Sequence, residues 1–85
     1  MADMIPIDEI RKQSAKLEKT VPGNYVHSKS GEKYMALEVL WDAIAQEFSV
    51  KYANYQGDRF CRLLSDFLAV VEVDGKKVQR FQRIK

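Results

Sequence analysis

The sequence contains few of the residues that build catalytic or metal centres. Among 85 residues there is one cysteine, Cys61, and one histidine, His27. One cysteine cannot form an intramolecular disulfide, and one cysteine with one histidine falls short of the four ligands of a structural zinc site. Such sparse cysteine is typical of a reducing compartment. We therefore expect a cytoplasmic protein that uses no metal and no cofactor.

Signals for export, for membrane insertion and for catalysis are also missing. The first ten residues combine acids with a proline, where a signal peptide needs basic residues followed by an apolar run. No apolar run approaches the length of a membrane span. No serine lies in a nucleophile-elbow motif, and the four glycines are too scattered to form a phosphate-binding loop. We therefore expect a protein that is not an enzyme and does not bind membranes.

Length and charge pattern predict one small domain behind an N-terminal helix. Eighty-five residues suffice for one compact core, and a net charge of +2 is weak attraction for a polyanion. We divide the chain into a leader (1–6), a helix (7–21) and a folded domain (22–85). The helix is indicated by apolar residues near helical spacing: Ile7, Ile10, Leu17 and Val21.

The predicted helix needs a partner for its apolar side. A helix of about a dozen residues is marginal in isolation, so this stripe should be covered by the domain or by another chain. Pro22 and Gly23 end the helix, since the residue before a proline disfavours helical geometry and glycine permits a sharp turn. A homodimer formed through this helix is one expectation that follows.

After Gly23 the sequence changes to short β-leaning runs separated by turn residues. The clearest turn is Asp74-Gly75, because this pair accepts the positive φ angles of a two-residue hairpin and valines flank it. A brief helical turn is expected around Ser65–Leu68. The predicted strands lie near Asn24–His27, Lys33–Leu40, Glu47–Tyr55, Phe60–Leu63, Val70–Val73 and Val78–Ile84.

Residues 31–48 fit two patterns. Helical spacing is shown by Tyr34, Leu37, Trp41, Ile44 and Phe48. A β-hairpin connected by 42–46 is the alternative, in which strand alternation places Met35, Leu37, Val39 and Trp41 on one face. Periodicity alone slightly favours the helix.

A family resemblance runs along most of the chain. The residues that carry it are Gly23, Tyr25, His27, Lys29, Gly31, Tyr34, Leu37, Val39, Val50, Tyr52, Gly57, Arg62, Leu64, Phe67, Val71, Gly75, Val78, Arg80 and Phe81. Together they resemble a bacterial and phage family catalogued as domain of unknown function 1653, over about residues 22–84. The chain departs from that family at Phe60, where tryptophan is usual, and at Leu63, where proline is common.

The resemblance brings no assigned activity, but it implies a bacterial or phage origin and bears on the secondary structure. Its pattern favours two strands over a helix in 31–48. With strands there, the chain is mainly β, an α+β protein whose five or six short strands predict a small SH3-like antiparallel barrel behind the N-terminal helix. Such barrels bind peptides, nucleic acid or other proteins through loops and one sheet face.

The candidate binding residues place basic groups beside aromatic rings. They are Tyr25, His27, Lys29, Tyr52, Arg62 and Arg80. Guanidinium groups next to rings can clamp a carboxylate or can stack on bases while neutralising phosphate. In a purely structural role, the tyrosines would line the core and the arginines would pair with Glu72 or Asp66. For Cys61 we expect a small apolar filler, and for Phe67 and Phe81 inward-facing rings.

Two functions remain open from the sequence. The first is a non-catalytic interaction module that binds a protein partner through the aromatic and basic barrel face. The second is a nucleic-acid or nucleotide binder that uses the same residues as an anion-holding patch. The small net charge favours the first.

Overall fold

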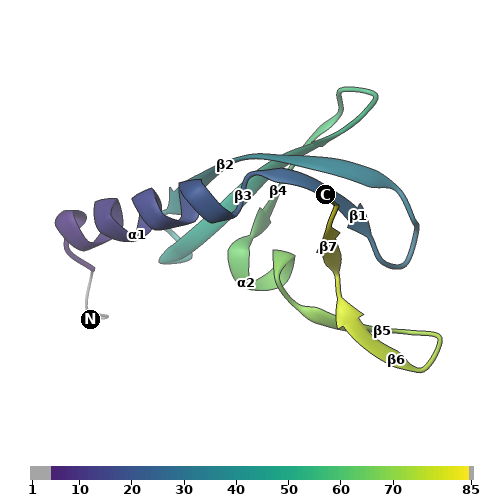
Figure 1. Cartoon of the computed structure of the whole chain (residues 1–85). Helices are drawn as coiled ribbons and strands as arrows, with labels where there is room; N and C mark the ends of the chain where they lie inside the picture. The colour runs from purple at the N-terminus through teal and green to yellow at the C-terminus, as the bar shows by residue number, and fades with distance from the viewer. Residues whose placement is uncertain (1–4, 85) are drawn as a thin grey trace.

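The computed structural model describes residues 5–84, which form an N-terminal helix, a curved five-stranded sheet, a short second helix and a separate hairpin (Figure 1). The sheet is antiparallel, with strand order β4-β3-β2-β1-β7, and β5 pairs with β6 in a second, two-stranded sheet. The elements are α1 (Ile7–Thr20), β1 (Gly23–His27), β2 (Lys33–Asp42), β3 (Glu47–Asn54), β4 (Arg59–Leu63), α2 (Leu64–Phe67), β5 (Val70–Val73), β6 (Lys76–Gln79) and β7 (Phe81–Arg83).

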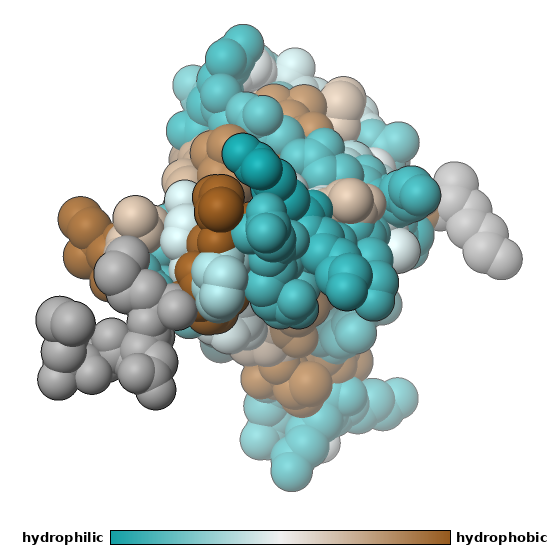
Figure 2. Space-filling view, turned by 90° about the vertical axis from the view of Figure 1, so that its left-hand side faces the viewer, coloured by the Kyte–Doolittle hydropathy of each residue, from teal (hydrophilic) through white to brown (hydrophobic). Residues whose placement is uncertain are grey.

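Helix α1 forms where the apolar spacing predicts it. Asp8 lies in its first turn and Lys19 in its last, and both charges suit the helix dipole. Ile10 and Leu17 pack against the core, whereas Ile7 stays largely exposed. In Figure 2, which faces the α1 end, the helix presents a hydrophilic side next to a strip of hydrophobic residues. The domain thus covers part of the apolar stripe and leaves the helix start uncovered.

Residues 31–48 contain strands, as the family resemblance implies, but the predicted alternation is wrong. A bulge interrupts the β2–β3 pairing between Ala36 and Glu38. Ala36 and Val39 are both buried, and Leu37 between them is exposed. The extra residue breaks the two-residue repeat, so that Ala36 and Val39 face the core three positions apart. The helical spacing noted in the sequence does not describe the buried face, since Leu37 and Ile44 are exposed.

The predicted last strand, Val78–Ile84, is two strands. β6 pairs with β5, and β7 pairs with β1, with Arg80 in the link between them. The Arg80 N–H donates to the Ala69 carbonyl oxygen (2.7 Å), and its own carbonyl accepts from the Ser28 N–H (2.9 Å). The chain therefore changes sheets at Arg80.

This change of sheets leaves the fold open. Within residues 5–84 the strands form two separate sheets, and β4 and β7 are the outer strands of the larger one. The predicted closed SH3-like barrel is therefore not confirmed, although the mainly β architecture with one N-terminal helix is. The hairpin at Asp74-Gly75 is observed as expected, with Val71 opposite Val78.

The core lies on the sheet face that α2 covers. Phe67 projects from α2 into it with 1% exposure, and its ring stacks on Phe81 with centroids 4.4 Å apart. Both rings point inward as predicted. The expectation that Cys61 fills space in the core is wrong, because its side chain is exposed. It lies on β4 between two residues of the core-facing side. Among the described residues no helix is both long and apolar enough to cross a membrane.

Candidate functional site

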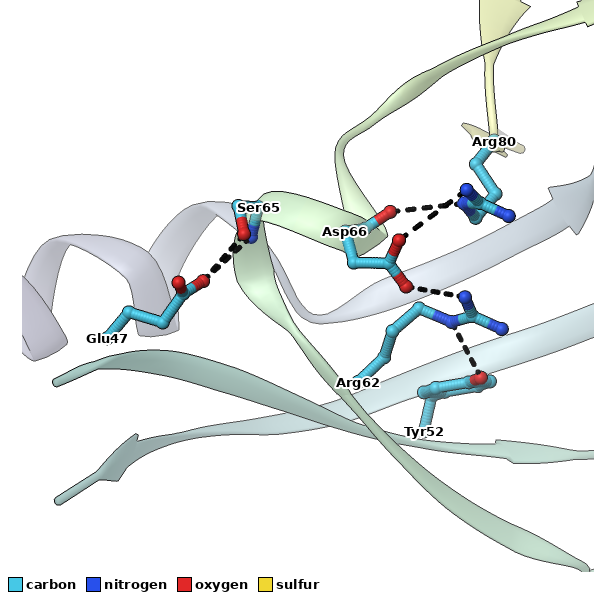
Figure 3. A network of polar contacts seen from close by, with 6 residues as sticks. All are labelled: Glu47, Tyr52, Arg62, Ser65, Asp66 and Arg80. Carbon is cyan, nitrogen blue, oxygen red and sulfur yellow. Dashed lines mark hydrogen bonds and ion pairs between the residues drawn. The ribbon is translucent and has the colours of Figure 1, made fainter. Parts of the chain in front are cut away.

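Two arginines and one carboxylate meet at the edge of the core. The Arg62 Nη1 lies 2.6 Å from Oδ2 of Asp66, and the Arg80 Nη2 lies 3.5 Å from Oδ1 of the same carboxylate (Figure 3). Arg62 Nε also donates to the Tyr52 hydroxyl (3.2 Å). We call these four residues, Tyr52, Arg62, Asp66 and Arg80, the Asp66 network. They come from β3, β4, α2 and the link before β7.

Backbone and side-chain contacts fix the position of this network. Glu47 of β3 accepts hydrogen bonds from the Ser65 hydroxyl (2.7 Å) and backbone N–H (3.4 Å), which ties the start of α2 to the sheet (Figure 3). Phe67 anchors the other end of α2 in the core. Arg80 is held through its backbone, and its Nε donates to the Asp66 carbonyl oxygen (3.2 Å). The guanidinium groups are therefore placed by the fold.

Asp66 carries its charge at ordinary pH. The hydrogen bond from Arg62 lowers the pKa of the Asp66 carboxyl, and the nearby charge of Arg80 acts in the same direction. Two positive groups thus share one negative group, which leaves one positive charge uncompensated. The side chains of Arg62 and Arg80 are 31% and 26% exposed, so this charge lies at a half-open surface.

His27 borders the Asp66 network, and the charges of the network affect its pKa. The His27 ring packs edge-on against the Phe81 ring, with centroids 5.1 Å apart. The Arg62 guanidinium lies 5.6 Å from the centroid of the Phe81 ring. Burial lowers the pKa of His27, and the charges of Arg62 and Arg80 lower it further. Its Nδ1 accepts from the Ser30 backbone N–H (3.3 Å), which fits a neutral ring. His27 thus lies beside two cations whose charges oppose its own protonation.

Aromatic rings line the sheet beside the network. Tyr34 packs against Tyr52 (5.5 Å), Phe60 (6.0 Å) and Phe81 (5.7 Å), and Phe60 stacks on Tyr52 at 5.3 Å. Phe60 keeps 40% of its surface exposed at the β4 edge. A half-exposed apolar wall therefore adjoins the uncompensated charge.

The structure brings four of the six predicted residues together and separates the other two. His27, Tyr52, Arg62 and Arg80 converge on one face. Lys29 is exposed in the turn after β1, where its charge makes a small contribution to the lowered pKa of His27. Tyr25 is buried and uses its hydroxyl within the fold, where it donates to the Val21 carbonyl (2.6 Å). Tyr25 is therefore a structural residue.

A second arginine arrangement, which the sequence did not reveal, lies at Tyr25. The Arg83 guanidinium lies 5.0 Å from the Tyr25 ring centroid, and Nη2 donates to the Tyr25 hydroxyl (2.9 Å). The same group donates to the carbonyls of Thr20, Val21 and Pro22. A side chain on β7 thus satisfies carbonyl groups at the end of α1, which have no partner within the helix.

The described part of the chain holds no cluster of metal ligands in this face. Within residues 5–84 no group of three or more histidine, cysteine or acidic side chains could hold a metal ion. Cys61 and His27 cannot act as a pair, since Cys61 lies on the opposite side of the sheet from the Phe60 and Arg62 side chains. What the face offers is donors, charge and flat rings.

Comparison with known protein families matches residues 23–83 to the family described as "Protein of unknown function (DUF1653)". The chain belongs to this family. The DUF1653 match includes every strand, α2 and the whole Asp66 network, whereas α1 precedes it. None of the curated proteins and none of the solved structures that were compared with the chain matches it.

Sequence reasoning about this DUF1653 domain missed residues whose partners are distant in the chain. Arg83 contacts carbonyls more than 60 positions away, and no local pattern signals that contact. Tyr34 donates to Glu32 (2.9 Å), which also lies near His27. Asp66 was expected as one of two possible partners for the arginines, and it is the partner of both.

Proposed function

We propose that the protein is a non-catalytic interaction module that binds a protein partner through one face of its sheet. This binding face consists of His27, Tyr34, Tyr52, Phe60, Arg62 and Arg80. The observation that carries the proposal is that two guanidinium groups with a surplus positive charge lie beside the partly exposed rings of Tyr34 and Phe60 on a preformed surface. Interfaces are enriched in arginine and aromatic residues, because both bury much surface while keeping polar contacts. The proposal requires no closed barrel.

Site-specific photo-crosslinking in cells tests this proposal. A photoreactive phenylalanine analogue replaces Phe60 on the binding face in one sample and Met35 in the other. Met35 is similarly exposed but points to the opposite side of the sheet, since its neighbours Tyr34 and Ala36 face the core. We expect a discrete protein crosslink from position 60 and none from position 35. Equal labelling from both positions, or none from either, would contradict the proposal.

Nucleic acid or a nucleotide is the second candidate, because exposed rings beside arginines suit base stacking with phosphate neutralisation. This candidate predicts binding of single-stranded oligonucleotides at low salt and a steep loss of affinity as salt rises. It also predicts that the crosslink from position 60 is removed by nuclease. We favour the protein partner, since the net charge is only +2 and the carboxylates of Asp66 and Glu32 lie within or beside the face.

A homodimer through α1 is a further part of the proposal. Ile5 and Ile7 are exposed at the start of the helix. Sedimentation analysis of the wild type and of Ile7→Lys tests it. Concentration-dependent association that the substitution abolishes is the expected result, and a wild-type monomer at all concentrations would rule this part out.

A further inference from the structure

Asp66 shows what kind of group the two arginines accept. One carboxylate spans them, with one oxygen toward Arg62 and the other toward Arg80. This contact uses only part of each guanidinium. Within residues 5–84 neither Nη2 of Arg62 nor Nη1 of Arg80 has a hydrogen-bond acceptor. Each arginine thus keeps one amino group available for a ligand.

The two available groups point in the same direction. In Figure 3 the free nitrogen of each guanidinium lies on the side away from Asp66, and both project out of the network. Because Asp66 bridges the arginines on one side, their spacing already suits the two oxygens of a carboxylate. A second carboxylate on the open side would meet the same pair of cations. Arginine forks are well suited to such paired contacts.

We infer that the Arg62–Arg80 pair is a binding site for the carboxylate of an acidic side chain on the protein partner. The inference rests on the proposed protein-binding function and names the chemistry of the group that the partner contributes. The partner's carboxylate would accept from Arg62 Nη2 and Arg80 Nη1, opposite Asp66. The aromatic residues Tyr34 and Phe60 would pack against the apolar part of the same segment.

Charge balance favours a single carboxylate over a phosphate. Arg62, Arg80 and Asp66 sum to one positive charge, which one carboxylate neutralises. A phosphate dianion would exceed it while lying close to Asp66 and Glu32, and desolvated like charges repel each other. Burial and the charges of Arg62 and Arg80 also oppose a positive charge on His27, because they lower its pKa. The local balance therefore matches a singly charged group.

Nuclear magnetic resonance on the full chain tests this inference with defined probes. The first probe is a capped tripeptide with a central glutamate. The second is the same peptide with glutamine, and the third is the glutamine peptide with a free C-terminal carboxylate. Inorganic phosphate is the fourth. Signals are followed from the Nε–H groups of Arg62 and Arg80 and from the ring of His27, the only histidine in the sequence.

We expect the glutamate peptide to shift all three signals more than the other probes do and to raise the pKa of His27, because it neutralises the surplus positive charge beside the ring. Arg80→Gln and, separately, Arg62→Lys should weaken this binding about tenfold or more, as loss of a charge-assisted hydrogen bond predicts. Arg59→Gln is the matched control. It removes one charge from exposed Arg59 on β4, whose side chain forms no hydrogen bond or ion pair within residues 5–84.

Several results would overturn the inference. These are a stronger response to phosphate or to the C-terminal carboxylate, an equal loss in Arg59→Gln, and no response of wild-type protein to the glutamate peptide. The wild-type titrations do not depend on the folding of any variant. A protein crosslink at position 60 without any response to glutamate would refute the carboxylate site and leave the proposed function intact. Glutamate binding without any crosslink would refute the protein partner and show only that the arginine pair binds a carboxylate.

Discussion

Arginine occurs in two arrangements in this molecule, and they differ in whether any guanidinium donor stays available for a ligand. Arg83 lies above the Tyr25 ring and directs its donors to three carbonyls and a hydroxyl of the same chain. Arg62 lies above Phe81 in a similar way, but it shares a single carboxylate with Arg80, and one of its donors has no acceptor among residues 5–84. The first arrangement completes the fold by capping α1. The second is held by the fold and remains unsaturated, which is the condition for binding something else.

The largest expected effect comes from Phe67→Ala, which should damage both arrangements at once. The Phe67 ring contacts Tyr25 (5.1 Å) on one side of the core and Phe81 (4.4 Å) on the other. Truncating a fully buried phenylalanine costs about 3–5 kcal/mol, a large part of the stability of so small a domain. Urea unfolding followed by circular dichroism measures this loss. A loss below about 1 kcal/mol would mean that this ring is not central to the core.

Arg83→Met separates capping from binding. The substitution keeps an unbranched side chain but removes the guanidinium group with its donors, so the carbonyls of Thr20, Val21 and Pro22 lose a charged partner. We expect the free energy of unfolding to fall by about 1–3 kcal/mol, with reduced helical signal and unchanged binding of the glutamate peptide. Weaker peptide binding at unchanged stability would reverse the roles assigned to the two arrangements.

Gly23→Ala should also disturb the contacts between Arg83 and the end of α1, by changing the residue that Arg83 packs against. Gly23 has φ +146°, and a Cβ there would overlap the Arg83 guanidinium. The substitution should therefore displace Arg83 from the end of α1 and lower the free energy of unfolding by more than about 1 kcal/mol. In Arg83→Met the overlap is relieved, so the double variant should lose less than the sum of the two single losses. Strict additivity in thermal or urea unfolding would argue against the contact.

Asp66→Asn tests the charge that holds the open pair. The pKa of Asp66 is lowered in the folded protein, so its stabilising contribution is complete above the unfolded value of about 3.9 and is lost as pH falls through the folded value. The wild type should therefore be more stable than the variant near neutral pH, and the two should converge in acid. Unfolding midpoints measured across that range check this. A constant difference at all pH values would show that the Asp66 charge is not involved.

The smallest effect concerns the pKa of His27. Its folded value is lowered, so stability is complete above the unfolded value of about 6.5 and declines as pH falls toward the folded value. Arg80→Gln should raise the His27 pKa only partway, because burial is the main cause of the shift and the charges of Arg62 and Lys29 remain. Glu32 opposes these charges and is unchanged. A single ring signal in the proton spectrum suffices for the titration, and an unaltered pKa would place Arg80 too far away to matter.

The sequence predicts those parts of the fold that depend on local patterns. Alternating apolar residues, the Asp74-Gly75 turn and the proline after α1 indicate most strands and the helix end. The bulge at Leu37 is not visible, because one inserted residue imitates helical spacing. The break at Arg80 is also hidden, since it depends on hydrogen bonds to Ala69 and Ser28 from other parts of the chain.

For the site as well, local residue types predict one part and contacts between distant segments decide the rest. Residue types alone suggested that aromatic and basic side chains would share a face, and His27, Tyr52, Arg62 and Arg80 do so. They could not distinguish Tyr25, which is also an aromatic residue with a hydroxyl group. That hydroxyl is already hydrogen-bonded within the fold, to the Val21 carbonyl and to Arg83. Nor could they place Cys61, because neighbouring strand residues point to opposite sides and the register decides which side is buried. Long-range pairing therefore determines which polar groups stay available.

The affinity for the protein that crosslinks at position 60 tests the central claim most directly, when it is measured with wild type, Arg80→Gln and Arg59→Gln. All three chains should have the same folded spectrum apart from local changes. We predict binding at least about tenfold weaker for Arg80→Gln and unchanged for Arg59→Gln. Equal affinity of Arg80→Gln and wild type would contradict a binding face built on the unsaturated arginine pair.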